Sequence, residues 1–312
     1  MLEVVRRVLI PSRAKVDLLA LSRTLPKEKG TYDSAFRRAR NAGVSVELYK
    51  RRRQSKVPEI DGEVLYGTHP VLEALRSGRR EIRCVYGRDS AEMNSDIRDL
   101  CARRNIPVKE VSSRVLDNMS EYQLHNSVCA DASSLQIQPF SLEDVPQEGR
   151  CAFLYLDGVL DPGNIGAIIR SATFFGINGI LWARTKGPKR LTPSMSKASS
   201  GALEHFPVFS VESFAELHQL LKPDFSFVGT LDQDSAASKN VEVKELSRTS
   251  APPRSVFVMG DEHKGVSREV LELCDVLISI PRSPSSSVAS LNVSVATGLL
   301  LHLWASSRVK KL

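Results

Sequence analysis

The chain has 312 residues, of which 42% are hydrophobic and 25% are charged. This composition is typical of a folded protein with one or two domains, and it argues against wholesale disorder. No apolar run approaches the length of a membrane-spanning helix, because the best one, Gly298–Trp304, is interrupted by His302. We therefore expect a soluble protein without a membrane partner.

The formal net charge of +7 is concentrated near the N-terminus. Residues 1–60 contain 15 Lys and Arg against 6 Asp and Glu, so the rest of the chain is nearly neutral. Such a segment is compatible with a solvated tail or with an arm that binds nucleic acid. Residues 1–23 mix Arg and Lys with Val, Ile and Leu and contain few acids, which is typical of a mitochondrial transit peptide. We interpret residues 1–60 as a basic extension with a transit peptide, and we expect the protein in the mitochondrial matrix.

The five cysteines and six histidines show no pattern of metal ligands. No C-x-x-C pair and no H-x-x-x-H spacing occurs in the sequence. We expect the cysteines to be reduced thiols in the core and the protein to bind no metal.

Residues 61–137 have the pattern of a small α/β domain. Pro70 suits the first turn of a helix that ends at Gly78. A strand is predicted over Ile82, Cys84 and Tyr86, which recur at every second position. A further helix is predicted over Ala91–Arg104, and further strands over Ile106–Val111 and Ser127–Ile137. Residues 138–150, with two prolines and a glycine, are predicted to be a linker.

Residues 151–308 show a regular alternation of apolar strands and helical patterns. This alternation predicts a mostly parallel sheet with helices on both faces. Strands are predicted over Ala152–Leu156, Gly179–Trp182, Phe225–Val228, Ser255–Met259 and Val276–Ile280. In such sheets ligands bind beyond the carboxyl ends of the strands. The segments that follow these ends are therefore the candidate site.

The first candidate segment is Asp157–Ala172, with the sequence DGVLDPGNIGAIIRSA. Asp161-Pro162-Gly163 is typical of a turn, and Asn164 is a good candidate for the N-cap of the helix that follows. Apolar residues then recur at helical spacing, and Gly176 is expected to end the helix.

Arg170 lies off the apolar stripe of this predicted helix. Its neighbours at i−4 and i−3, Gly166 and Ala167, are small, and helical side chains lean toward the N-terminus. We therefore expect Arg170 to reach over bare backbone toward Asn164 and the preceding loop. The alternative is a solvated helix arginine, but the small residues in its path favour a functional guanidinium.

Two further segments follow strand ends. Met259–Ser267 (MGDEHKGVS) is a glycine-bearing loop in which Ser267 can cap the next helix, although an ordinary strand-to-helix loop would have the same pattern. In Ser287–Ala296 (SVASLNVSVA), Ser290 or Asn292 can cap a long apolar helix. Leu291, between two residues of capping type, is expected to face the ligand crevice and to form a wall for an adenine or another base.

Two other classes of nucleotide site find no support in the sequence. No G-x-G-x-x-G follows a strand, and no G-x-x-x-x-G-K-[ST] occurs. A Rossmann-type dinucleotide site and a P-loop NTPase are therefore both unsupported.

Taken together, the three segments resemble the signature motifs of the SpoU-type RNA ribose 2′-O-methyltransferases of the SPOUT superfamily. Asn164 and Arg170 match the first motif, Gly260 and Glu262 the second, and Ser290, Leu291 and Asn292 the third. The similarity covers about 240 residues, Glu63–Ser306, and includes SKASSGALE between the first two motifs. Within the family it is strongest to the enzymes that methylate a guanosine of mitochondrial large-subunit rRNA and to their bacterial relatives.

The resemblance implies a catalytic domain with a C-terminal trefoil knot, a homodimer, and a preceding domain similar to small RNA-binding ribosomal proteins. It also implies S-adenosylmethionine as the cofactor and rRNA as the partner. Backbone groups around Thr230, Gly260, Ile280 and Leu291 would hold the cofactor. The chain departs from the family at His125-Asn126-Ser127-Val128, where relatives often have His-Gln-Gly-Ile, and this puts the choice of RNA target in doubt.

The implied reaction is the attack of a ribose 2′-oxygen on a sulfonium methyl group. We expect Arg170 to bind the phosphate or hydroxyl of the target nucleotide and to stabilise the developing oxyanion. Asn164, Glu262, Ser290 and Asn292 would hold the loops and orient Arg170. Two alternatives stay open: the same chemistry on tRNA, and a catalytically silent RNA-binding assembly factor.

Overall fold

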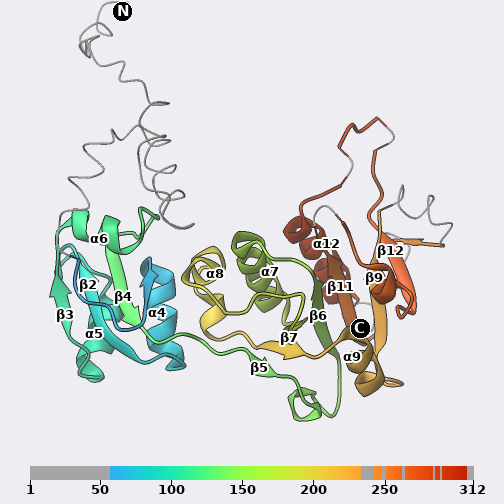
Figure 1. Cartoon of the computed structure of the whole chain (residues 1–312), viewed down its shortest axis with the longest axis horizontal. Coiled ribbons are helices and arrows are strands. Elements are labelled where there is room, and N and C mark those ends of the chain that lie inside the picture. Colours follow the sequence, from blue (N-terminus) through green and yellow to red (C-terminus); the bar gives the residue numbers. More distant parts are fainter. Residues whose placement is uncertain are drawn as a thin grey trace, which may run out of the picture. The chain divides into compact units, whose positions relative to one another are not determined.

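The computed structural model describes residues 57–232, 242–246, 251–261, 264–283, 285–288 and 290–307. The predicted transit peptide lies outside these residues, and so does Glu262. The described chain contains two separate sheets with helices packed on them (Figure 1). Within the described ranges no helix has the length and apolar character needed to span a bilayer, and no group of three potential metal ligands is found.

Residues 57–137 form the small domain, which is built on a four-stranded sheet. Strand β4 lies between β1 and β2 and is antiparallel to both, and β3 pairs with β2 in parallel. In chain order the elements are β1 (Glu63–Tyr66), α4 (Thr68–Ser77), β2 (Ile82–Gly87), α5 (Ser95–Arg103), β3 (Val108–Glu110), α6 (Ser113–Met119) and β4 (Val128–Ala132).

The small α/β domain is confirmed, but several boundaries differ from the predicted ones. Helix α4 ends where Gly78 adopts a left-handed conformation, as expected. Helix α5 begins at Ser95 rather than Ala91, because the Asn94 side chain caps it by accepting a hydrogen bond from the Ile97 amide at 3.3 Å. The predicted strands that became β3 and β4 are shorter than expected, and helix α6 was not predicted at all.

The second sheet has eight strands in the order β10-β12-β9-β11-β6-β7-β8-β5, and all its pairs are parallel. Its strands are β5 (Gln138–Pro139), β6 (Cys151–Asp157), β7 (Gly179–Ala183), β8 (Val208–Val211), β9 (Ser226–Thr230), β10 (Lys244–Glu245), β11 (Arg254–Gly260) and β12 (Val276–Ser279). Its helices are α7 (Pro162–Phe175), α8 (Pro193–Ala198), α9 (Phe214–Leu221), α11 (Arg268–Leu271) and α12 (Val293–Ser306), with 3-10 turns η1 (Leu142–Asp144) and η2 (Ala202–Glu204).

Helices cover both faces of this sheet, as predicted. Ile168 of α7 and Trp304 of α12 belong to the core on one face, and Leu217 of α9 and Val270 of α11 belong to the core on the other. The five predicted strands are all present. Strands β5, β8 and β10 were not predicted. Strands β5 and β10 have only two residues each and are defined by their pairing with β8 and β12.

The start of helix α7 corrects one prediction. The N-cap is Asp161, whose side chain accepts a hydrogen bond from the Asn164 amide at 2.8 Å. Pro162 occupies the first helical turn, where its fixed φ and missing N–H are tolerated, so the cap lies one residue before it. Asn164 is therefore not the cap.

The register of β6 and β11 aligns the ends of two motif-bearing strands. Asp157, the last residue of β6, is paired with Gly260, the last residue of β11. The neighbouring strand β9 ends at Thr230 and pairs with both β11 and β12. The segments singled out in the sequence are thus brought to one edge of the sheet by parallel pairing.

Candidate functional site

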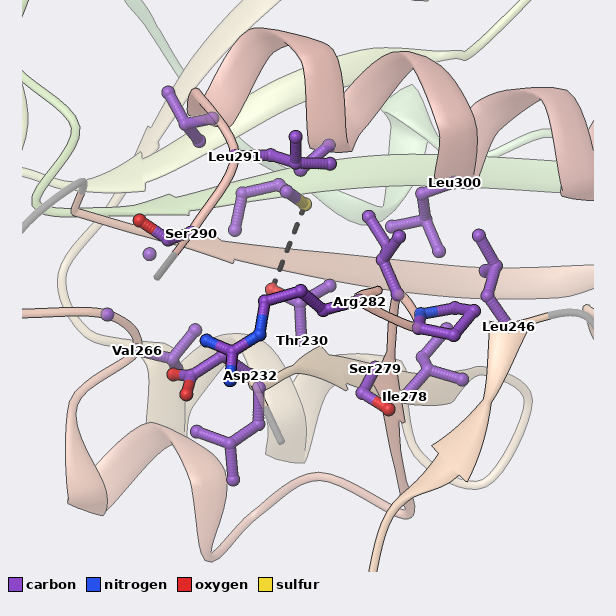
Figure 2. A pocket seen from close by; sticks show the side chains of 18 of the residues that line it. Thr230, Asp232, Leu246, Val266, Ile278, Ser279, Arg282, Ser290, Leu291 and Leu300 are labelled. Atoms are coloured by element: carbon purple, nitrogen blue, oxygen red, sulfur yellow. Dashed lines mark hydrogen bonds between the residues drawn. The ribbon is translucent and has the colours of Figure 1, made fainter. Parts of the chain in front are cut away.

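A cavity of about 620 Å³ opens at this edge of the sheet. Thr230, Gly260, Ile280 and Leu291, the four residues predicted to surround a cofactor, all line it, and so does Ser290. Figure 2 shows Leu291 and Leu300 on the side of α12, and Thr230 and Asp232 at the ends of the strands. The wall is apolar near Met259, Ile278, Val293 and Leu300, and polar near Asp232, Arg282 and Ser283.

Gly260 is required by the fold of the loop that follows it. A Cβ atom at this position would lie 2.2 Å from the Gly265 carbonyl carbon and 2.3 Å from the Val266 nitrogen. The loop folds back through an isolated bridge between Asp261 and Gly265, and the Asp261 carboxylate accepts a hydrogen bond from the Lys264 amide at 2.8 Å. Only a residue without a side chain lets backbone approach backbone this closely.

Thr230 contributes backbone rather than a free hydroxyl to the cavity. Its Oγ1 donates a hydrogen bond to the Val258 carbonyl at 2.8 Å, which ties the end of β9 to β11. This arrangement is compatible with the expectation that backbone groups, and not side-chain hydroxyls, face a cofactor here.

Asp157 ties two of the motif loops together, although sequence reasoning did not select it as a site residue. The residue is 4% exposed, and its carboxylate accepts a hydrogen bond from the Ser267 amide at 2.7 Å. Its carbonyl accepts one from the Asp261 amide at 3.1 Å, and Lys186 Nζ lies 3.3 Å from its Oδ1. An acidic residue at the end of a buried strand was the available signal.

Ser267 lies at the N-cap position of α11, as predicted, but its hydroxyl makes no capping bond. The hydroxyl instead lies 3.3 Å from Lys186 Nζ, and that lysine also contacts Glu269. Burial opposes the charge on Lys186, but Glu269 and Asp157 outweigh it, so the pKa of the lysine is raised.

The first and third motifs meet through a pair of asparagines. Asn292 is the N-cap of α12: its Oδ1 accepts hydrogen bonds from the Ser294 amide at 2.9 Å and from the Ser294 hydroxyl at 2.6 Å. Its Nδ2 donates to Asn164 Oδ1 of α7 at 2.9 Å. The bond joins α7 to the segment that carries Ser290 and Leu291 into the cavity wall.

Arg170 lies on the exposed side of α7, away from the core, as expected. It is six residues after Asn164, which is about 9 Å along a helix axis. Gly166, one of its small neighbours, has a packing role that the sequence did not indicate. A Cβ there would lie 2.5 Å from Ala198 Cβ and 2.6 Å from the Met195 carbonyl, so this glycine permits α8 to pack on α7.

The predicted residues therefore fall into two groups. Thr230, Gly260, Ile280, Leu291 and Ser290 line the cavity, whereas Asn164, Arg170 and Asn292 do not. The second group lies on α7 and at the start of α12, and the asparagine bond connects the two groups. Glu262 lies outside the described residues.

Thiol chemistry finds no support in the described chain. The five cysteines are free, and four of them are buried. Burial raises the pKa of Cys274 to about 12, with nearby Asp275 and Asp157 acting in the same direction. A thiol with so high a pKa is protonated at neutral pH and is a poor nucleophile.

Comparison with known proteins identifies the family. A profile described as "SpoU rRNA Methylase family" matches residues 152–302, and one described as "RNA 2'-O ribose methyltransferase substrate binding" matches residues 64–138. The chain is 32% identical over 278 residues to "rRNA methyltransferase 1, mitochondrial" of Homo sapiens, covering 84% of this chain and 78% of that protein. The Schizosaccharomyces pombe protein of the same name is 32% identical, covering 82% of this chain and 93% of its own length.

Bacterial and solved relatives agree with this result. The "23S rRNA (guanosine-2'-O-)-methyltransferase RlmB" of Pseudomonas syringae is 32% identical, covering 77% of this chain and 93% of that protein. The fold is shared with the SpoU methyltransferase AviRb of Streptomyces viridochromogenes, solved in complex with AdoMet, at a TM-score of 0.61 and 22% identity, covering 79% of this chain and 90% of that one. The resemblance inferred from the three motifs is confirmed, and the chain belongs to the SpoU rRNA methylase family.

Proposed function

We propose that the protein transfers a methyl group from S-adenosylmethionine to the 2′-oxygen of a ribose, on a guanosine of mitochondrial large-subunit rRNA. The observation that carries this proposal is the hydrogen bond from Asn292 to Asn164. It joins the wall of the cavity to the helix that presents Arg170 on its exposed side. The names of the two mitochondrial relatives support rRNA as the substrate, and the name of RlmB supports guanosine as the methylated nucleotide.

The cavity fits the cofactor in size and in chemistry. Its volume lies within the range of about 300–1,000 Å³ that is common for small-molecule sites, and its mixture of apolar walls and a few polar groups is typical of them. The close backbone approach at Gly260 provides amide and carbonyl groups without side chains in the way. We assign Thr230, Gly260, Ile280 and Leu291 to the cofactor, with Leu291 as an apolar wall for its base.

When bound, S-adenosylmethionine supplies an electrophilic methyl group on a sulfonium centre. The residues of this chain then have two tasks: to orient the ribose hydroxyl and to stabilise negative charge on its oxygen. Arg170 suits the second task, because a guanidinium keeps its charge and presents a rigid fork of donors to phosphate or hydroxyl oxygens. Asn164, Asn292, Ser290 and Glu262 position the loops around it. No imidazole or thiol lines the cavity in the described part of the chain.

We also propose a homodimer, formed over the outer face of α12 and the adjoining end of α7. Leu300, Leu301 and Trp304 point into the core of the subunit, whereas Val295 and Leu299 of the same helix are exposed. Phe174 of α7 is 82% exposed. Large apolar side chains gathered on a surface are typical of interfaces. The trefoil knot and the domain limits at 61–137, 138–150 and 151–308 are further parts of this proposal that follow from the family.

The names of the relatives from human and fission yeast support a mitochondrial location. We propose that residues 1–60 provide the import signal to the matrix. A fluorescent fusion lacking residues 1–25 should lose import, and continued import of that fusion would contradict this assignment.

The function is tested by mapping 2′-O-methyl groups in total RNA from cells with and without the gene. The proposal expects the loss of one methylated guanosine in mitochondrial large-subunit rRNA. Loss of a methyl group from tRNA would instead establish the first alternative. An unchanged methylation map together with defective ribosome assembly would establish the silent assembly factor.

A further inference from the structure

Lys197 lies where helix α8 contacts the small domain. Its Nζ is 3.1 Å from Asn126 Oδ1, and a Cβ at Gly67 would lie only 2.6 Å from the same nitrogen. The ammonium group is therefore held against two loops of the small domain, one before α4 and one before β4. Figure 1 shows α8 between α4 and α7, and both helices contact it.

The charge of Lys197 has no counter-ion within the part of the chain that the structure describes, and the ammonium group donates a hydrogen bond to the neutral Asn126 amide. Lys186 and Lys222, in contrast, each contact a carboxylate, from Asp157 and Asp275 respectively. Burial lowers the pKa of Lys197, and the weak opposing influence of Cys129 does not offset it. Burying part of a cation without a nearby anion costs free energy, and an anionic ligand beside the ammonium group would offset this cost.

The contact between α8 and the small domain does not depend on Lys197. Arg80 and Glu204 have fully buried side chains, and their two hydrogen bonds measure 2.7 and 3.2 Å. Ser196, the neighbour of Lys197, donates to Glu204 Oε1 at 2.7 Å, and a Cβ at Gly201 would lie 2.8 Å from the His69 carbonyl oxygen. This buried ion pair holds the segment that carries Lys197 against the small domain, so the lysine is not needed for that contact.

The loop that receives Lys197 has an unusual backbone conformation. Asn126 and Ser127 both have left-handed backbone, with φ of 50° and 61°. The loop is held by His125, whose Nδ1 accepts a hydrogen bond from the Ser127 amide at 3.0 Å and whose ring lies 3.3 Å from Asp117. The Asn126 and Ser127 side chains are exposed and polar, which leaves room for a ligand next to the ammonium group.

Helix α8 also contacts the helix that carries Arg170. Ala198, the next residue after Lys197, packs on Gly166, one helical turn before Arg170. Lys197 and Arg170 are thus carried on two helices in direct contact. The distance between a ligand bound at Lys197 and a nucleotide bound at Arg170 would therefore be set by the packing of these two helices.

From this geometry we infer that Lys197, together with Asn126, forms a contact for a backbone phosphate of the RNA substrate, at the junction of the small domain and the large sheet. The inference rests on the proposed function. A phosphate held here sets the distance between the RNA bound by the small domain and the ribose presented to Arg170. Lys197 thereby helps to determine which nucleotide is methylated, without touching the reacting atoms.

The test is the salt dependence of RNA binding, measured by fluorescence anisotropy with a transcript of mitochondrial large-subunit rRNA. Loss of one phosphate contact should reduce the slope of log K against log salt by about 0.7 to 0.9. We expect this for Lys197→Met and for Lys197→Gln, with binding weakened by roughly fivefold to tenfold near physiological salt. Lys222→Met, which removes an equal charge elsewhere, should leave the slope unchanged.

The variant Asn126→Ala distinguishes a phosphate contact of Lys197 from a purely structural role of that lysine. It removes the hydrogen bond to Lys197 but keeps the charge, so the salt slope should stay at the wild-type value. If Lys197→Met has the wild-type slope, or if it and Asn126→Ala weaken binding equally without a change in slope, the inference is overturned. If the wild-type protein itself neither binds nor methylates the transcript, the proposed function fails, and the inference falls with it.

Discussion

Asn292 Nδ2 donates a hydrogen bond of 2.9 Å to Asn164 Oδ1, across 128 residues of sequence. The same Asn292 side chain caps helix α12, and the neighbouring residues Leu291 and Ser290 line the cavity. A single amide thereby connects the cavity wall to helix α7. Because Arg170 is carried on α7, which also packs on α12 in the core, this contact is one of those that place α7 relative to the cavity.

The first prediction concerns Asn164→Ala. Alanine is a good helix former, so α7 should be retained and the free energy of unfolding should change by less than about 1.5 kcal/mol, the value of one hydrogen bond. Loss of the contact with Asn292 should lower the rate of methyl transfer by roughly 10- to 100-fold, because small misplacements are costly in catalysis. Single-turnover kinetics and a thermal melt check both parts. An unaltered rate would show that the bond does not align the two motifs.

The second prediction concerns Arg170. If the guanidinium stabilises the reacting oxygen, Arg170→Ala should lower the single-turnover rate by roughly 10²–10³. Since Arg170 is exposed, folding and cofactor binding should be nearly normal. Arg170→Lys keeps the charge but loses the fork of donors, so it should recover little activity. A rate for Arg170→Ala within about threefold of wild type would remove the residue from the active site.

The third prediction compares two glycines. In Gly260→Ala the new Cβ would meet the backbone of Gly265 and Val266, so the loop must shift, and affinity for S-adenosylmethionine should fall together with about 1–3 kcal/mol of stability. Gly298 of α12 is the matched control, because a Cβ there meets nothing within 4 Å. Gly298→Ala should leave affinity unchanged and raise stability by about 0.5–1 kcal/mol. Isothermal titration calorimetry and chemical denaturation provide the two measurements, and equal affinities for the two variants would contradict the assignment of Gly260.

The fourth prediction concerns Leu291, which lines the cavity but is also exposed. Leu291→Arg should fold normally, because the new side chain can reach solvent. It should abolish binding of S-adenosylmethionine by placing charge and bulk in the apolar wall. Calorimetry that finds unchanged affinity, or binding that requires a divalent ion, would refute the assigned cofactor site.

The fifth prediction concerns the proposed homodimer. Light scattering should report a dimer at micromolar concentration, and Leu299→Glu should shift it toward the monomer, since an unpaired charge would be buried at the interface. The exposed position of Leu299 means that the subunit itself should still fold. A wild-type protein that is monomeric at this concentration would rule the interface out.

The sequence by itself determined the fold class, the five central strands, the helix that ends at Gly176 and the family. These features depend on local rules, namely the period of apolar residues, the conformational freedom of glycine and the spacing of three motifs. The cavity-lining positions of Gly260 and Leu291 were also predictable, because parallel strands bring the segments after their carboxyl ends to one edge.

Only the tertiary structure decided the contacts between segments distant in sequence. Asp161 rather than Asn164 caps α7, and the Asn164 side chain accepts a hydrogen bond from Asn292. A Cβ at Gly166 would collide with α8, so close packing of α8 on α7 requires a glycine here. The bond between Asn164 and Asn292 and the contact of α8 with Gly166 have no local signal, since each depends on which group another element presents, and pairing across long separations is fixed by packing of the whole chain.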